Sequence, residues 1–156
     1  MAVNDTADAN DPRVIDRLLT SRGHWAVVGL STNRARAAYG VAAYLQELGH
    51  RITPVHPRAE TVHGSPGVEH LQDVPGPIDV VDVFVNSHRA GAVIDEAIAV
   101  GARAVWLQLG VRDRAAEERA RAAGLDVVVD ACPRIEGGSR GLGPGAAAAE
   151  SGGPRA

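Results

Sequence analysis

The residues best suited to do chemistry in this chain form a turn between an apolar run and a helical pattern. The apolar run ends at Gly29, small polar residues follow (Ser31, Thr32 and Asn33), and Arg34 closes the turn. A strand that enters a helix through such a turn leaves the first N–H groups of the helix without intrahelical partners. Those N–H groups and the helix dipole favour an anion, most often a phosphate. The turn therefore predicts a phosphate site, although the same residues also suit a tight turn with a helix cap.

Strand-like and helix-like patterns alternate along the chain from residue 25 to residue 129. Such alternation favours parallel strands joined by right-handed helical crossovers. We expect an α/β fold, namely a Rossmann-like, doubly wound parallel sheet of five to six strands in three αβα layers. Ser87 is expected to be the N-cap of the helix that follows the third long strand. Strands are expected at 25–29, 51–55, 78–85, 104–109 and 126–129, with a short edge strand near residue 68, and helices at 12–20, 37–48, 88–100 and 114–123, with a helical turn at 69–73.

Length and composition indicate a single folded domain, because 156 residues with 45% hydrophobic residues suffice for one core. We expect a disordered arm at 1–10, a folded domain at 11–136, and a disordered tail rich in Gly, Ala and Pro at 137–156. The net charge of −3 gives no drive toward nucleic acid or an anionic membrane. No apolar run approaches the ~20 residues of a membrane span. The single cysteine, Cys132, excludes an internal disulfide and favours a cytoplasmic protein.

The carboxyl ends of the expected strands give a short list of candidate ligand segments. In an open parallel sheet, ligands bind beyond these ends, at the point where the strand order reverses. The segments at these ends are 29–34, 56–58, 85–89, 108–110 and 130–133.

The type of nucleotide follows from what these segments contain. The dinucleotide fingerprint G-x-G-x-x-G is absent, because the first turn has only Gly29. The second strand ends in Val55, His56, Pro57 and Arg58, without the carboxylate that a ribose diol requires. An arginine at this position favours a phosphate on the ribose instead, and both NADP and coenzyme A carry one. No P-loop motif is present, and the chain contains no lysine.

Six blocks of sequence, in order, resemble the CoA-binding domain family. This is the Rossmann-like domain found at the start of the succinyl-CoA synthetase α-subunit and, in a stand-alone form, in small bacterial CoA-binding proteins. The resemblance covers roughly residues 12–136. The blocks are Val27-Val28-Gly29-Leu30-Ser31, Tyr39-Gly40-Val41-Ala42, Pro54-Val55-His56-Pro57, Val80-Val81-Asp82-Val83-Phe84, Ala104-Val105-Trp106-Leu107-Gln108-Leu109-Gly110 and Gly124-Leu125-Asp126-Val127-Val128-Val129-Asp130-Ala131-Cys132.

The resemblance implies coenzyme A or an acyl-CoA as the cofactor. It places the turn after the first strand on the pyrophosphate, and Pro57 and Arg58 beside the adenosine 3′-phosphate. It also places Phe84 and the residues after it along the adenine or pantetheine groove, with Gln108 bordering the ligand. The complete set of expected ligand-binding residues is Gly29, Ser31, Thr32, Asn33, Arg34, Tyr39, His56, Pro57, Arg58, Phe84, Val85, Asn86 and Gln108.

The chain departs from the stand-alone members of that family in three places. His56 stands where those members usually have asparagine. Val85 and Asn86 stand where they have basic residues, and the segment 137–139 is Gly-Gly-Ser where basic residues are common. Losing positive charge beside a phosphate weakens the electrostatic part of binding.

Several other residues have two readings. Cys132 suits a buried structural thiol, or alternatively a reactive thiol near the pantetheine end. Asp82 is expected to be buried and hydrogen-bonded within the sheet. Among the six histidines, which show no metal-site spacing, only His56 is expected at the mouth of the sheet, and most of the others are expected at the surface. Arg36 suits either solvated surface or a phosphate contact. The charge of Arg89, in the first turn of a helix, opposes the helix dipole, so Arg89 is expected to be exposed or, alternatively, to lie near an anion.

No nucleophile–base pair and no carboxylate pair emerges, so the sequence predicts binding rather than catalysis, with no catalytic or metal residues. The expected partner is a small nucleotide ligand, not nucleic acid or a membrane, and a homodimer or a protein partner remains open. One alternative is an NADP-binding oxidoreductase fragment. Another is a regulatory module that has lost its ligand, in which Tyr39 or His56 would fill the groove.

Overall fold

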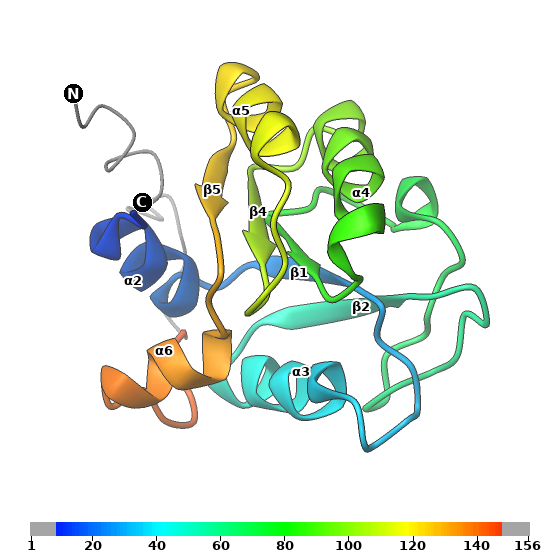
Figure 1. Cartoon of the computed structure of the whole chain (residues 1–156). Helices are drawn as coiled ribbons and strands as arrows, with labels where there is room; N and C mark the ends of the chain where they lie inside the picture. The colour runs from blue at the N-terminus through cyan, green and yellow to red at the C-terminus, as the bar shows by residue number, and fades with distance from the viewer. Residues whose placement is uncertain (1–8, 148–156) are drawn as a thin grey trace.

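The computed structural model describes residues 9–147, which form a parallel β-sheet covered by helices on both faces (Figure 1). The parts of the expected arm and tail at 1–8 and 148–156 lie outside the described residues. The sheet has five strands in the order β2-β1-β3-β4-β5, which confirms the expected α/β, Rossmann-like class. The strands are β1 (His24–Val28), β2 (Arg51–Val55), β3 (Val80–Val83), β4 (Ala104–Leu107) and β5 (Asp126–Val128).

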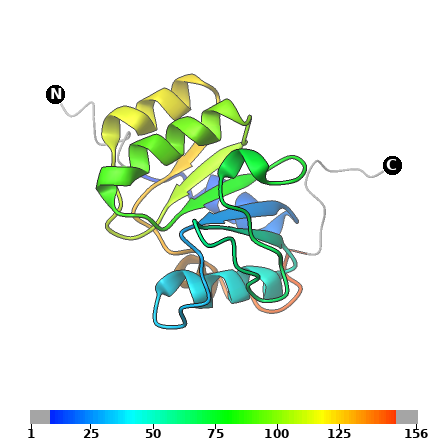
Figure 2. The ribbon, with the colours of Figure 1, turned by 90° about the vertical axis from the view of Figure 1, so that its right-hand side faces the viewer.

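The helices lie in two layers, one on each face of the sheet (Figure 2). Helices α4 and α5 cover one face over an aliphatic core that includes Val81 and Val83, while α2, α3 and α6 cover the other. The second face carries Trp25 and Trp106, and its alternating pattern also places Asp82 there. The helices are α2 (Pro12–Thr20), α3 (Ala37–Leu48), α4 (Ser87–Ala99), α5 (Arg114–Ala122) and α6 (Pro133–Ser139), with a 3₁₀ turn, η1 (Leu71–Asp73).

Local signals explain where several helices begin and end. Asp11 caps α2 by accepting the Arg13 N–H at 2.9 Å, and Asp113 caps α5 by accepting the Ala116 N–H at 3.0 Å. Gly49 ends α3 with φ at 119°, a left-handed conformation that glycine adopts without a Cβ penalty. The N-cap of α4 is Asn86 rather than Ser87, which corrects the expected cap.

The strand order places the switch point between β1 and β3. The chain leaves β1 toward β2 on one side and returns across β1 to form β3 on the other side. The two strands run in register, with Val28 paired to Val83 at their carboxyl ends. Ligands in open parallel sheets bind beyond such a pair of ends.

Residues 137–147, which were expected to be disordered, are folded against the rest of the domain. Residues 137–139 complete α6, and Ala147 is fully buried and donates its N–H to the Leu48 carbonyl at 2.7 Å. The Tyr44 hydroxyl also donates to the Leu142 carbonyl at 2.9 Å. The expected disordered tail is therefore corrected for residues 137–147, because a Gly- and Ala-rich segment packs closely when α3 offers it a surface.

The amino ends of the strands also hold polar groups that we expected at the surface. Both His24 and His50 are buried, and each ring bonds through both of its nitrogens. None of the helices in the described residues has the length and apolar character that a membrane span needs.

Candidate functional site

A cleft of about 620 Å³ opens at the switch point, at the carboxyl ends of β1, β2 and β3. Its sheet side is formed by residues at these strand ends, including Gly29, His56 and Phe84. The first turns of α4 and the segment around η1 form the rest of the wall. The volume lies in the range of ~300–1,000 Å³ that is usual for small-molecule sites.

Gly29 allows the two central strands to end close together. Its φ is 103°, which a side chain would strain, and an added Cβ would lie 3.2 Å from the Phe84 Cβ and 3.3 Å from the Phe84 carbonyl oxygen. The glycine is therefore required by the close approach of β1 and β3 at the floor of the cleft. Its own N–H is bonded to the Val55 carbonyl at 2.8 Å, so it does not face a ligand.

Two arginines line the cleft without a carboxylate partner. They are Arg36, at the start of α3, and Arg89, in the first turn of α4, and neither guanidinium forms an ion pair within residues 9–147. Sequence reasoning left the role of Arg36 open, and for Arg89 it favoured exposure over a nearby anion; Arg89 is exposed and also lines the cleft. A sequence signal for Arg89 does exist, because Arg89, Val93 and Glu96 have helical spacing and all three line the cleft.

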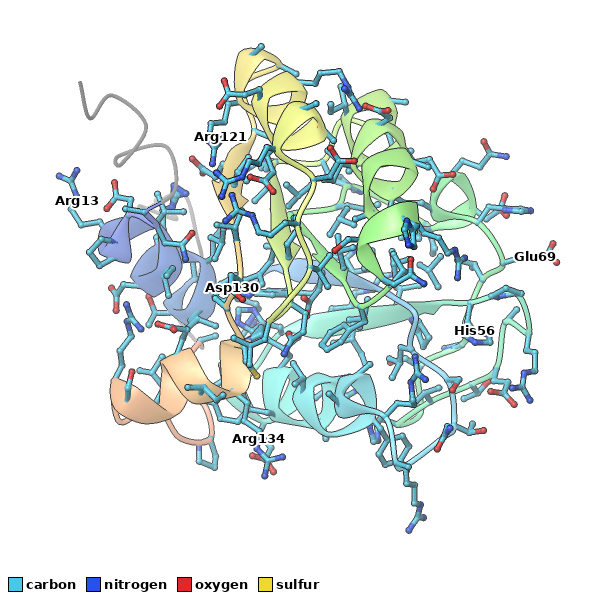
Figure 3. All side chains as sticks on the ribbon, viewed as in Figure 1. Arg13, His56, Glu69, Arg121, Asp130 and Arg134 are labelled. Carbon is cyan, nitrogen blue, oxygen red and sulfur yellow. The ribbon has the colours of Figure 1, made fainter. Side chains whose placement is uncertain are left out.

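Other ionisable groups surround these arginines. The histidines at 56, 70 and 88 line the cleft, together with Glu69 and Glu96. Figure 3 shows His56 beside the end of β2 and Glu69 at the outer margin of the molecule. The described residues contain no group of three or more His, Cys, Asp or Glu that is suited to hold a metal ion.

The turn from β3 into α4 presents its backbone to the cleft. Asn86, the N-cap, lines the cleft and makes no side-chain cap bond. Ser87 accepts the Arg112 N–H at 3.1 Å through its hydroxyl, which ties the turn to the loop after β4. The first N–H groups of α4 have no acceptor inside the helix, so its positive end suits an anion.

The turn from β1 into α3 is more closed than the sequence suggested. The Ser31 hydroxyl accepts the Asn33 N–H at 3.2 Å, and the Asn33 side-chain oxygen accepts the Ala35 N–H at 2.9 Å. Within residues 29–36, the N–H groups of residues 30, 31 and 34 have no acceptor among the described residues. Ser31 and Asn33 therefore stabilise the turn itself, as in the alternative reading of a tight turn.

Thr32 binds an internal carboxylate. Glu60, from the segment after β2, accepts both the Thr32 N–H at 3.1 Å and the Thr32 hydroxyl at 3.2 Å through one oxygen. This contact shows that the turn accepts an anionic oxygen at its backbone. The sequence did not indicate it, because the two residues lie 28 positions apart.

Three other expected residues lie outside the cleft. The Tyr39 ring packs against His63, with ring centroids 4.3 Å apart, and the Arg34 guanidinium carbon lies 5.8 Å from the Tyr39 ring centre. Arg58 is exposed and does not line the cleft. Of the expected set, the cleft brings together Gly29, His56, Pro57, Phe84, Val85 and Asn86, whereas Ser31, Thr32, Asn33, Arg34, Tyr39, Arg58 and Gln108 do not line it.

Polar groups on the α3 face of the sheet are buried without partners. Gln108, at the end of β4, is 8% exposed, and its side-chain oxygen has no hydrogen bond. Asp82 is fully buried, and neither carboxylate oxygen has a partner, which corrects the expected hydrogen bonding. Burial raises the pKa of Asp82 well above its ordinary value. Cys132 is buried at the start of α6, consistent with a structural thiol.

Known proteins share this arrangement of strands and helices. Residues 23–138 match the family described as CoA binding domain. The uncharacterized protein YneT of Bacillus subtilis (strain 168) is 31% identical over 121 residues, which are 78% of this chain and 90% of that protein.

Two solved structures are similar over most of their length. A hypothetical protein from Pyrococcus horikoshii OT3 is 34% identical with a TM-score of 0.80, over 85% of this chain and 93% of that one. A protein from Thermus thermophilus is 31% identical with a TM-score of 0.76, over 83% of this chain and 98% of that one. Together with the match over residues 23–138, these likenesses place the protein in the CoA-binding domain family, which indicates CoA binding in general.

Proposed function

We propose that the protein binds coenzyme A or an acyl-CoA in the cleft between the carboxyl ends of β1 and β3, in a non-catalytic role. The observation that carries this proposal is the pair of arginines, Arg36 and Arg89, which line the cleft without ion-pair partners in the described part of the chain. Guanidinium groups left unpaired at a concave site favour a phosphate-bearing ligand.

The cleft offers separate surfaces for the two chemical parts of a nucleotide. Phe84, Val85 and Pro57 supply apolar surface for the adenine ring. Arg36, Arg89 and the open end of α4 supply positive charge for the phosphates. The two arginines thus compensate for the basic residues that stand-alone family members have at the positions of Val85 and Asn86.

A binding role is supported by the types of side chain in the cleft. No serine, threonine or cysteine is among the described residues that line it. His70 and Glu69 approach each other to 3.4 Å, but their side chains are 62% and 60% exposed, so water screens the pair. A general base must lie within hydrogen-bond reach of the proton that it removes, and no hydroxyl or thiol among the described cleft residues offers such a proton.

The alternative of a module without a ligand receives no support from the cleft. A groove filled by Tyr39 or His56 would favour that alternative. Tyr39 instead packs against His63 outside the cleft, and His56 lines a cavity that remains open at about 620 Å³.

Calorimetric titration with CoA, dephospho-CoA and NADPH tests the proposal. We expect CoA to bind about tenfold more tightly than dephospho-CoA, because one extra phosphate reaches an arginine. NADPH is the control ligand, since it also carries a ribose phosphate but no pantetheine arm. Absence of CoA binding at millimolar ligand would overturn the proposal, and tighter binding of NADPH than of CoA would favour the oxidoreductase alternative.

A further inference from the structure

The side chain of Glu60 joins two segments that are distant in sequence. Glu60 lies in the segment that follows β2, and it reaches the turn between β1 and α3. One of its carboxylate oxygens accepts both the N–H and the hydroxyl of Thr32, at 3.1 and 3.2 Å. The turn that predicted a phosphate site from the sequence is therefore already in contact with an anion from the protein itself.

The bonded group is an ionised carboxylate at neutral pH. The Thr32 N–H lowers the pKa of Glu60, and the nearby positive charges of Arg58 and, when protonated, His56 lower it further. A carboxylate and a phosphate oxygen make the same demand on a backbone N–H, namely a short charge-assisted hydrogen bond. The two groups cannot occupy the Thr32 N–H at the same time.

We propose that Glu60 is an internal competitor for anions at the β1–α3 turn. In the free protein its carboxylate holds the Thr32 N–H, and it must leave before a phosphate of the ligand can take that N–H. This inference rests on the proposed function, because it requires a phosphate of that ligand to extend from the cleft, at Arg36, to Thr32 in the turn, which does not itself line the cleft. It makes Glu60 a residue that sets affinity without touching the bound ligand.

The backbone around Glu60 is anchored on both sides. On one side, the His56 N–H donates to the Val68 carbonyl at 3.0 Å. On the other side, Val62 is buried and exchanges hydrogen bonds with Ser65 at 3.0 and 2.9 Å, in a two-residue hairpin with positive φ at its centre. Release of Thr32 therefore requires rotation of the Glu60 side chain, not opening of the segment.

Neighbouring contacts strengthen this anchoring. The His63 ring bonds to the Tyr39 carbonyl of α3 through Nε2 at 2.8 Å, and Gln46 donates to the His63 carbonyl at 3.1 Å. An added Cβ at Gly67 would lie 2.3 Å from the Glu60 carbonyl oxygen, so the chain passes closely behind Glu60. Substitution of the Glu60 side chain should leave the fold intact, because none of these contacts uses its carboxylate.

Two substitutions separate the charge of Glu60 from its hydrogen bond. Glu60→Ala removes both, whereas Glu60→Gln removes the charge but keeps an oxygen that can accept from Thr32. Glu47→Gln is the matched control, because Glu47 is an exposed residue at the other end of α3 and loses the same charge.

The probes are inorganic pyrophosphate and CoA, and the readout is the Thr32 amide signal in NMR spectra together with the dissociation constant. We expect Glu60→Ala to bind both probes about three- to fivefold more tightly than wild type, which is the size of one exposed charged contact. The affinity of Glu60→Gln should lie between those of wild type and Glu60→Ala. The affinity of Glu47→Gln should equal that of wild type. In the absence of any probe, the Thr32 amide signal should move in Glu60→Ala and stay in place in Glu47→Gln.

The outcomes distinguish failure of this inference from failure of the proposed function. If CoA binds wild type and Glu60→Ala equally well, the competitor is refuted and CoA binding stands. If pyrophosphate shifts Thr32 more strongly in Glu60→Ala but CoA binds no variant, the competitor stands and the proposed ligand is wrong. If neither probe moves the Thr32 signal in any variant, no external anion uses this turn and the inference is overturned.

Discussion

The two edges of the sheet use their polar residues in opposite ways. At the amino edge, a cavity of about 230 Å³ lies between α2 and the strand starts, and two of its three arginines are paired. Arg17 bonds to Asp126, and Arg103 lies 3.9 Å from Asp79. At the carboxyl edge, Arg36 and Arg89 line a larger cleft with no carboxylate partner in the described residues.

The same contrast holds for the histidines. At the amino edge, His50 accepts the Gly23 N–H at 3.1 Å and bonds to the Leu19 carbonyl at 2.9 Å. His24 likewise bonds to the Pro77 carbonyl and to the Thr53 hydroxyl, at 2.9 and 2.7 Å. The histidine at 56 lines the open cleft, and only its Nδ1 forms a hydrogen bond within the described residues, from the Arg58 N–H at 3.1 Å. The two histidines at the amino edge are therefore bonded within the fold, whereas Arg36 and Arg89 at the carboxyl edge have no ion pair among the described residues and stay available for a ligand.

The topology explains the difference between the edges. In a parallel sheet with helical crossovers, helices begin at the carboxyl edge and direct their positive ends there. Anions are therefore favoured at that edge. An arginine at that edge can bind an anionic ligand only if no carboxylate of the protein already pairs with it. Glu60 and Asp130 are carboxylates of the chain itself that bond to backbone N–H groups at the carboxyl edge.

Replacement of His50 should have the largest effect on stability. His50→Leu leaves the Gly23 N–H and the Leu19 carbonyl without their partner in a buried region, and we expect a loss of about 2–4 kcal/mol in the free energy of unfolding. Urea denaturation measures this loss. His70→Leu, at the carboxyl edge, is the control and should change stability by less than about 0.5 kcal/mol. Equal losses in both variants would contradict the contrast between the edges.

Replacement of Asp82 should have the opposite sign. Its buried carboxyl has no hydrogen-bond partner, so Asp82→Val should stabilise the protein at pH 7 by about 1–3 kcal/mol. Burial raises the pKa of Asp82 in the folded state, so the unfolded state loses the Asp82 proton at a lower pH than the folded state. Ionisation of Asp82 in the unfolded state therefore lowers the stability of the wild type as pH rises. The advantage of the variant should therefore be small near pH 4 and grow as pH rises, in urea denaturation at several pH values.

The same variant tests whether Asp82 belongs to the ligand site. We expect CoA affinity to be unchanged in Asp82→Val, because Asp82 does not line the cleft. If Asp82→Val gains stability but loses CoA affinity, Asp82 contributes to ligand binding from inside the sheet.

Neutralising the arginines of the cleft should lower affinity without unfolding the protein. Arg36→Gln and Arg89→Gln should each weaken CoA binding about fivefold, as expected for one exposed charged contact. The control is Arg22→Gln, because Arg22 is exposed, lies at the amino-edge cavity and has no ion pair among the described residues. If Arg22→Gln weakens binding as much as the other two, only overall charge matters and the cleft is not the site.

The smallest expected effect is the acid response of the amino edge. Burial lowers the pKa of both His24 and His50 below the ordinary 6.5, so the unfolded state takes up protons first as pH falls. Stability should therefore decline below pH 6.5 and level off once the folded pKa values are passed. The measurement uses Asp82→Val as the background, because the Asp82 carboxyl responds to pH in the opposite direction. Adding His50→Leu should reduce the decline.

Much of the fold could be predicted from local patterns. Asp11 and Pro12 marked the start of α2, Gly49 marked the end of α3, and the alternation of elements indicated a parallel sheet. Strand spans were less accurate, because the apolar run at 78–85 is longer than β3, whose bounds are Val80–Val83. Ile78 and Val85, at the two ends of this run, are buried although they lie outside the strand.

The site was predicted less completely than the fold. His56 and Phe84 were found because they follow strands in the sequence, and this rule needs no knowledge of strand order. The same rule placed Arg89 in a candidate ligand segment, but its place in the cleft was not singled out, because that depends on which side of β1 the strand β3 lies. The bond between Glu60 and Thr32 was also missed, because no local pattern relates them.

Although α6 was not expected, the sequence by itself determined the class of the fold, the approximate positions of the other helices and strands, and the family. These depend on hydrophobic period, caps and turn residues, which are local properties of the chain. Only the tertiary structure decided which polar residues are free and which are engaged. A hydrogen bond or an ion pair between distant segments forms only when α3, α4 and the sheet pack together. The open cleft and the bond between Glu60 and Thr32 therefore exist only in the folded chain.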